Sequence, residues 1–262
     1  MSETSDSPKK GQQNFCGACL LEALNKEISI LRINLLRGVM GATADNIALE
    51  EVLERGFARK RSNFLDDYGL QDKPVLMWQC LPAEIFLPDI SSKKILNAFS
   101  QGGGDRADDG WWHGFKSYTG PTLVFDGLAS SKNPDDGWVT ELHVDGYLSA
   151  GLWRFIEQGM RSEATVLEVA DFHVNAFRDF AFLIREICDA GEYKGMLHLT
   201  ATIFHADKLA LLSDHRPMPV SPPKRKTFRW PVVSVNVTNL EEAWKVMAAQ
   251  FLRIYSRRLP QS

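Results

Sequence analysis

The sequence predicts an α+β protein with a mostly antiparallel sheet, helices packed on one face of that sheet, and an N-terminal helix pair. Two observations support this fold class. Residues 165–204 have the pattern of a strand, an amphipathic helix and a strand, and residues 121–155 contain three short apolar runs separated by turn-forming residues. Because the first unit has apolar positions on both sides, the other elements are expected to pack on it.

The unit expected at the centre spans Thr165 to Phe204. Its first strand is TVLEVADF (165–172), and the helix that follows carries apolar residues at helical spacing, with its charged residues on the other face. Gly191 follows the last periodic residue, where helices commonly end. The run MLHLTATIF (196–204) is rich in β-branched and aromatic residues and therefore predicts the second strand.

Length and composition indicate an ordinary globular protein. The chain has 262 residues, of which 44% are hydrophobic and 24% charged, and its formal net charge is −3. A dedicated nucleic-acid binder has a strong excess of basic residues, and this chain has none, although the charge does not exclude a local basic patch. No apolar run is long enough to span a bilayer, and the polar N-terminus lacks an export signal. Four cysteines do not form a disulfide framework, so we expect a cytoplasmic protein without a membrane partner.

The sequence divides into a disordered tail at 1–14, a helical segment at 15–70 and an α+β domain at 71–262. The first helix has apolar residues at alternating spacings of three and four over residues 21–35. This spacing fits an amphipathic helix packed on its own domain, and it also fits a short coiled-coil seam. In the second interpretation, residues 15–37 bind another protein chain or a second copy of this one.

A second helix is expected to begin near Asp45 or Asn46. Its early turns are acidic and its last turns are basic, which is the charge order that the helix macrodipole favours. Beyond it, runs of apolar and β-branched residues predict strands, and a final amphipathic pattern predicts a C-terminal helix. The expected strands are 75–81, 121–128, 137–144, 147–155 and 227–237, and the expected helix is 240–258.

Cys16 and Cys19 form a CxxC pair at the start of the first helix. A thiol at a helix N-terminus gains thiolate character, as a redox pair requires, and two cysteines at this spacing are also found in zinc sites. The buried strand that precedes such a pair in thioredoxin-like folds has no counterpart, and no second paired motif supplies further zinc ligands. We therefore favour two ordinary cysteines at a helix end over a redox or metal site.

Glu141 and His143 alternate on the expected strand 137–144, and Asp145 continues the alternation just beyond it. On a strand all three project from one face, unless the following turn draws Asp145 away. A carboxylate, an imidazole and a second carboxylate side by side are a candidate metal or acid/base site. Alternating polar residues are also typical of the solvated face of a half-buried antiparallel strand. Both interpretations stay open.

Two basic groups are candidate contacts to nucleic acid. Lys224, Arg225 and Lys226 follow two prolines in a loop, and Arg257 and Arg258 end the last helix. The alternative for the first group is a solvated loop. None of the motifs GxSxG, HExxH, Walker A or GxGxxG occurs, and no cofactor is expected.

Part of the chain resembles a known family. A basic helix (52–65) precedes PVLMWQCLPAEIFLPDI (74–90), and Phe-Asp-Gly-Leu (125–128) precedes a strand ending in Trp-Arg-Phe (153–155). In this order they resemble the region that follows the Schlafen/AlbA-type domain in bacterial DNA-binding or ATP-binding proteins. The family's region continues with a long helix and a strand of the shared sheet, which residues 172–204 match.

The resemblance implies the accessory half of a nucleic-acid-associated or defence-related protein. The AlbA-type domain itself has no counterpart in residues 1–50, so the active half would be absent or supplied by another chain. We therefore expect a non-catalytic bacterial module that senses a ligand or a partner. The alternative is a metal-dependent hydrolase or nuclease that uses Glu141, His143 and Asp145, and direct binding of DNA is a third hypothesis.

Overall fold

The structure is a computed structural model that describes part of one compact unit, residues 41–262. The described residues are 44–100, 106, 114–117, 119–131, 137–153, 165–167, 170–211 and 223–256. For residues 44–50, 165–167, 170–174, 211 and 256 only the backbone is described. The expected tail at 1–14, the expected first helix and the interface at 15–37 lie outside these ranges.

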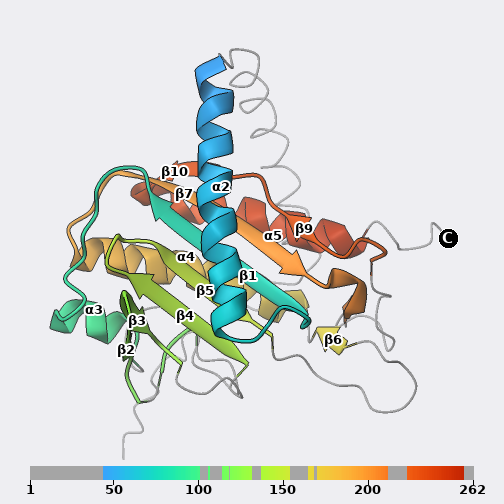
Figure 1. The fold of residues 1–262 in the computed structure, drawn as a ribbon, viewed down its shortest axis with the longest axis horizontal. Helices are drawn as coiled ribbons and strands as arrows, with labels where there is room; N and C mark the ends of the chain where they lie inside the picture. Colours follow the sequence, from blue (N-terminus) through green and yellow to red (C-terminus); the bar gives the residue numbers. More distant parts are fainter. Residues whose placement is uncertain are drawn as a thin grey trace, which may run out of the picture. The chain divides into compact units, whose positions relative to one another are not determined.

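An eight-stranded antiparallel sheet forms the framework of the unit (Figure 1), which confirms the predicted fold class. The strand order is β10-β7-β1-β5-β4-β3-β2, and β9 also pairs with β7. A separate two-stranded parallel sheet consists of β6 and β8. The strands are β1 (Val75–Pro82), β2 (Thr122–Val124), β3 (Gly127–Ala129), β4 (Trp138–His143), β5 (Leu148–Leu152), β6 (Thr165–Leu167), β7 (Met196–Phe204), β8 (Leu209–Leu211), β9 (Phe228–Arg229) and β10 (Val233–Asn236).

Helices lie on both faces of this sheet. Figure 1 shows α4 and α5 behind the sheet, as the prediction of a helical layer on one face requires, and α2 in front of it. The sequence places α2 in a separate helical segment, but the structure packs it on the sheet within the same compact unit. The helices are α2 (Ala44–Asp67), α3 (Lys93–Ala98), α4 (Ala170–Ala190) and α5 (Leu240–Ser256), with short 3-10 turns η2 (Ala206–Lys208) and η3 (Val237–Asn239).

β1 contributes side chains to the packing on both faces of the sheet, because successive residues of a strand point to opposite faces. Trp78 faces α4, is fully buried, and lies with its ring centroid 5.3 Å from that of Phe177. Its neighbours Met77 and Gln79 face α2 instead. Such a strand must be apolar or internally hydrogen-bonded along its whole length, which explains the continuous apolar run that predicted it.

α2 is held on the sheet by an aromatic contact and a buried polar contact. Phe64 packs in a cluster with Met77 and Val139, over Gly151 of β5, where a methyl group would lie 2.6 Å from the Phe64 ring. One turn earlier, the guanidinium of Arg61 donates to Oε1 of Gln79 at 3.1 Å. Both partners are almost completely buried, so this polar pair fixes the position of the helix on the strand.

Three strand predictions are wrong in detail. The run 121–128 is a tight hairpin, β2 and β3, because the chain turns at Phe125 and Asp126. Of the run 165–172, Thr165–Leu167 is a strand that pairs with β8 outside the main sheet, and Ala170 already begins α4. Of the expected central unit, α4 and β7 pack at the main sheet as predicted. The run 227–237 is divided into β9 and β10 around Pro231, which has no amide hydrogen for a ladder.

Candidate functional site

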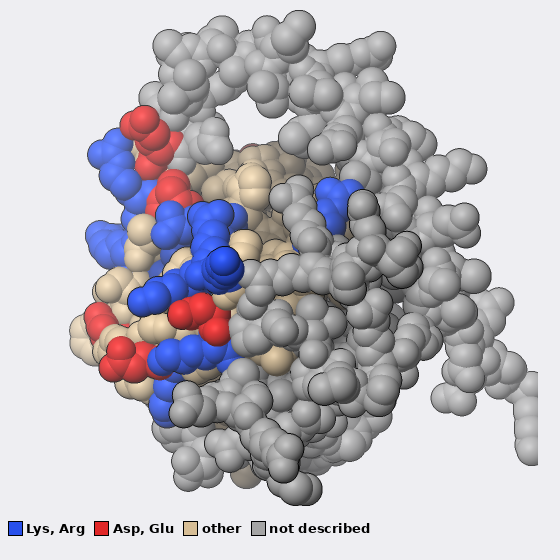
Figure 2. All heavy atoms as spheres, turned by 90° about the vertical axis from the view of Figure 1, so that its right-hand side faces the viewer, with Lys and Arg blue, Asp and Glu red and all other residues tan. Residues whose placement is uncertain are grey.

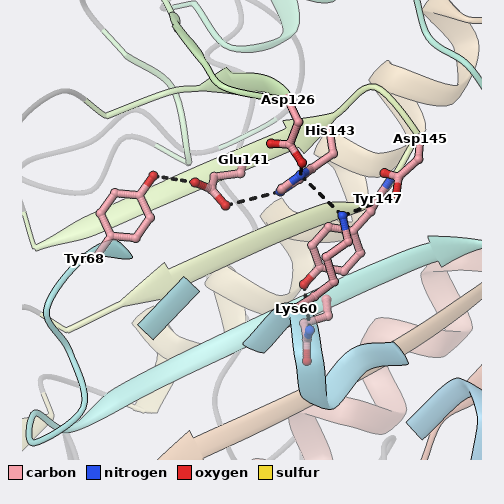
Figure 3. A network of polar contacts seen from close by, with 8 residues as sticks. Lys60, Tyr68, Asp126, Glu141, His143, Asp145 and Tyr147 are labelled. Atoms are coloured by element: carbon pink, nitrogen blue, oxygen red, sulfur yellow. Dashed lines mark hydrogen bonds and ion pairs between the residues drawn. The ribbon is translucent and has the colours of Figure 1, made fainter. Parts of the chain in front are cut away.

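The candidate site is a polar network on the α2 face of the sheet (Figure 3). β4 directs Glu141 and His143 to this face, because residues two apart on a strand share a side. Nε2 of His143 lies 3.3 Å from Oε2 of Glu141, and Nδ1 lies 2.7 Å from Oδ2 of Asp126. The hydroxyl of Tyr68 donates to the other oxygen of Glu141 at 2.6 Å. The imidazole of His143 therefore lies between two carboxylates, one from β4 and one from the turn between β2 and β3.

This arrangement favours the protonated form of His143, since both ring nitrogens must carry a hydrogen to donate to both carboxylates. Burial alone would lower the pKa of His143, but the hydrogen bonds to Glu141 and Asp126 outweigh it and raise that pKa above its usual value. Burial likewise tends to raise the pKa of Asp126, and the bond from His143 reverses this effect, so that its pKa is lowered. Both shifts favour the ion pair between the two groups.

Lys60 of α2 adds a third charge to the network. Its Nζ lies 3.3 Å from Oδ2 of Asp145 and 3.5 Å from Nδ1 of His143. Nδ1 cannot accept from Lys60 while it donates to Asp126, and we assign the bond to the nearer Asp126 oxygen. Lys60 then acts on His143 through its charge, which lowers the pKa of Asp126 and opposes protonation of His143. The ammonium also lies 4.9 Å from the centroid of the Tyr147 ring.

The structure brings two of the three predicted residues together. Glu141 and His143 meet, but Asp145 lies in the turn after β4, where its Oδ1 accepts from the backbone amide of Tyr147 at 3.1 Å. The carboxylate that binds His143 on its other side is Asp126. Within the described part of the chain, no three His, Cys, Asp or Glu side chains are arranged to hold a metal ion.

Sequence reasoning missed Asp126, Lys60 and Tyr68. Only Asp126 had a local signal, because Asp-Gly after an apolar run is a common hairpin turn. Its glycine is required by close packing, since a methyl group on Gly127 would collide with the backbone oxygen of Leu142 on the neighbouring strand. Lys60 and Tyr68 reach the site through the packing of α2, which no spacing in the sequence reveals.

An open pocket of about 560 Å³ lies beside this network. α2 forms one wall, the turn between β2 and β3 forms another, and β4 contributes the floor. The ring of Phe125 is fully exposed in that turn. The lining residues are Arg59, Lys60, Asn63, Phe64, Asp67, Phe125, Asp126, Glu141 and His143.

A second ionic cluster joins α2 to β9. Oε1 of Glu54 lies 2.7 Å from a guanidinium nitrogen of Arg61 and 2.7 Å from one of Arg229. Arg61 is 3% exposed and its pKa is lowered, chiefly by burial, whereas Arg229 is 47% exposed. The cluster helps to fix α2 on the sheet and therefore helps to shape the pocket wall.

The basic candidates for nucleic-acid binding are separate from the pocket lining. Lys224, Arg225 and Lys226 are exposed and lie just before β9, and the guanidinium of Arg225 lies 5.4 Å from the centroid of the Phe228 ring. Figure 2, which views the molecule from the right-hand side of Figure 1, shows Lys and Arg side chains gathered on part of the surface in view, with Asp and Glu side chains among them. Arg257 and Arg258, and the pair Cys16 and Cys19, lie outside the described residues.

Comparison of the chain with models of protein families, with characterised proteins and with solved structures gave no match. The similarity to the region after the Schlafen/AlbA-type domain therefore stays a hypothesis. Among the described residues, no helix has both the length and the apolar character that a membrane crossing requires.

Proposed function

We propose that this domain is a non-catalytic module that binds a small polar molecule in the pocket between α2, the β2–β3 turn and β4. The observation that carries this proposal is the engagement of both ring nitrogens of His143, at 2.7 Å from Asp126 and 3.3 Å from Glu141. The network is a preformed polar floor, and the pocket above it is open. Concave sites with a few fixed polar groups are the usual form of small-molecule sites.

The same observation disfavours an acid/base role for the network. A general base needs a free lone pair within reach of the substrate, and a histidine that binds a metal needs one for the ion. Both nitrogens of His143 instead direct hydrogens at carboxylates. Glu141 accepts from Tyr68 and His143, and Asp145 is engaged in its own turn. The alternative of a metal-dependent hydrolase or nuclease that uses Glu141, His143 and Asp145 therefore has less support from the geometry.

The biological setting is part of the proposal. A bacterial, cytoplasmic, nucleic-acid-associated or defence-related role rests on the family resemblance, and the exposed residues Lys224, Arg225 and Lys226 agree with it. In this setting, a ligand in the pocket would contact α2, which forms one wall of the pocket. A partner chain that binds α2 would then sense whether the pocket is occupied.

A screen for ligand-induced stabilisation tests the proposal. The chain is mixed with amino acids, organic acids, sugars, polyamines and nucleosides, and thermal unfolding is compared with that of Asn63→Trp, which fills the pocket from α2. Ser62→Trp is the matched control, since Ser62 is exposed and adjacent but does not line the pocket. We expect at least one compound to stabilise the wild type and Ser62→Trp, but not Asn63→Trp. Stabilisation of all three proteins, or of none, would contradict the proposal.

A further inference from the structure

The polar groups of the pocket fall into two sets. The residues of the network satisfy one another, with His143 held by Asp126 and Glu141 and with Lys60 paired with Asp145. The other polar wall residues on α2 do not. Within the part of the chain that the structure describes, the side chains of Arg59, Asn63 and Asp67 make no hydrogen bond or ion pair, although all three line the pocket.

The three wall residues lie in one row along α2, because side chains four residues apart on a helix lie on the same face. The row contains a cation, an amide and an anion at successive turns. Arg59 and Asp67 are eight residues apart, or about 12 Å along the helix axis. Asn63 lies between them and offers both a donor and an acceptor.

Charged neighbours on the same helix are paired, unlike this row. Arg55 forms an ion pair with Glu51 at 3.6 Å, and Oδ1 of Asp66 accepts from Gln71 at 2.8 Å. The wall therefore has a positive and a negative end that are not neutralised by the described residues around them, and they are too far apart to neutralise each other. The pocket has two poles of opposite charge.

We propose that the pocket selects a dipolar small molecule, with an anionic group bound at Arg59 and an ammonium group bound at Asp67. This inference rests on the proposed function and specifies its ligand class. The two charges of the ligand must be separated by a chain of several bonds, as in an ω-amino acid or a short zwitterionic peptide. Asn63 would bind a polar group between them, and the exposed ring of Phe125 would cover an apolar connecting chain at the rim.

Three probes with the same six-carbon chain separate this class from its alternatives. They are 6-aminohexanoate, which carries both charges, hexanoate, which carries the negative one alone, and hexylammonium, which carries the positive one alone. Binding of each is measured by isothermal titration calorimetry at low salt. We expect 6-aminohexanoate to bind about two- to fivefold more tightly than either single-charge probe, which is the factor that one added ion pair at an exposed site supplies.

Charge reversals on the wall test the orientation. Arg59→Asp and Asp67→Arg should each weaken binding of 6-aminohexanoate by about fivefold or more. The double variant R59D/D67R should recover binding, because the ligand can enter with its ends exchanged. Arg55→Asp and Asp66→Arg are matched controls on the same helix outside the pocket lining, and they should leave binding unchanged.

The outcomes distinguish this inference from the proposed function. Equal binding of the three probes, or binding that ignores both reversals, overturns the dipolar class and leaves the pocket as a ligand site. Absence of binding by all three probes also overturns it, and the stabilisation screen with Asn63→Trp then decides the proposed function separately. Failure of the double variant to recover binding, in a protein that unfolds at the wild-type temperature, overturns the assigned orientation.

Discussion

Nδ1 of His143 lies 2.7 Å from Oδ2 of Asp126, although His143 ends strand β4 and Asp126 lies in the turn between β2 and β3. The sheet register produces this contact. Gly127 is the partner of His143 across the β3–β4 ladder, and the backbone amide of Val144 donates to the carbonyl of Asp126 at 2.8 Å. A slip of one residue in this ladder would move His143 to the other face, so the ion pair and the strand register depend on each other.

Stability should decrease as the pH rises past neutrality because of His143. Its pKa is raised in the folded state, so its contribution is fully present below the unfolded value of about 6.5 and is lost as the pH rises through the folded pKa. The pKa of Asp126 is lowered, so its contribution is present above about 3.9 and is lost as the pH falls through its folded pKa.

Denaturant unfolding across this pH range, for the wild type and His143→Gln, measures the effect. The difference between the two free energies of unfolding should be largest between the two titrations and should shrink at higher pH. Comparing the two proteins cancels the contribution of His198, whose pKa is lowered by burial and whose effect has the opposite sign. A difference that grows with pH would contradict the assigned charge of His143.

Removal of one hydroxyl tests how strongly Glu141 depends on Tyr68. Tyr68→Phe removes a donor at 2.6 Å from a carboxylate that is 7% exposed, so we expect a loss of about 1.5–3 kcal/mol in the free energy of unfolding. Tyr193→Phe is the matched comparison, because its hydroxyl donates to a neutral carbonyl, that of Met196, at 2.6 Å. That loss should be about 0.5–1.5 kcal/mol. Equal losses for the two variants would show that the charge on Glu141 does not strengthen its hydrogen bond with Tyr68.

The two arginines that share Glu54 should contribute very differently. Arg61→Met removes a guanidinium that is 3% exposed and leaves the buried Oε1 of Gln79 without its donor, so the expected loss is about 1–3 kcal/mol. Arg229→Met removes a half-exposed partner at the same 2.7 Å distance, and the expected loss is below about 1 kcal/mol. Urea unfolding of the two variants measures both values. A larger loss for Arg229→Met would show that α2 is not held through Arg61.

Periodicity in the sequence was sufficient for much of the fold. The apolar run of β1, the stripe of α4 and the β-branched run of β7 each depend on local side-chain spacing, and all three form as predicted. The hairpin at Phe125 and Asp126 was not predicted, because the apolar residues on the two sides of the turn together have the composition of one strand. The place of α2 depends on the buried contact between Arg61 and Gln79, which no local pattern contains.

Only the part of the candidate site that depends on local spacing could be predicted from the sequence. Glu141 and His143 share one strand, so their spacing alone places them on one face. The third member, Asp126, joins them through the pairing of β3 with β4, and Lys60 joins through the packing of α2. Asp145 was expected beside them because it continues the alternation, but the strand ends at His143 and the following turn redirects its side chain.

A methyl group at Gly151 should separate α2 from the sheet. In Gly151→Ala the new Cβ would lie 2.6 Å from the ring of Phe64, in a buried cluster, so we expect a loss of about 1–3 kcal/mol. Gly56→Ala is the control within α2, since a Cβ there meets nothing within 4 Å. It should be neutral or stabilise the protein by about 0.5–1 kcal/mol through helix propensity. Thermal unfolding of both variants measures the contrast, and a neutral Gly151→Ala would contradict the packing of Phe64.

The most direct test of the account is an NMR titration of the imidazole rings. If His143 donates from both nitrogens to Asp126 and Glu141, both nitrogens carry protons and its pKa lies above about 6.5, while that of His198 lies below it. Asp126→Asn should lower the pKa of His143 toward its ordinary value. A His143 that is neutral below about pH 6.5, with one nitrogen free of protons, would contradict the binding module and favour an acid/base site.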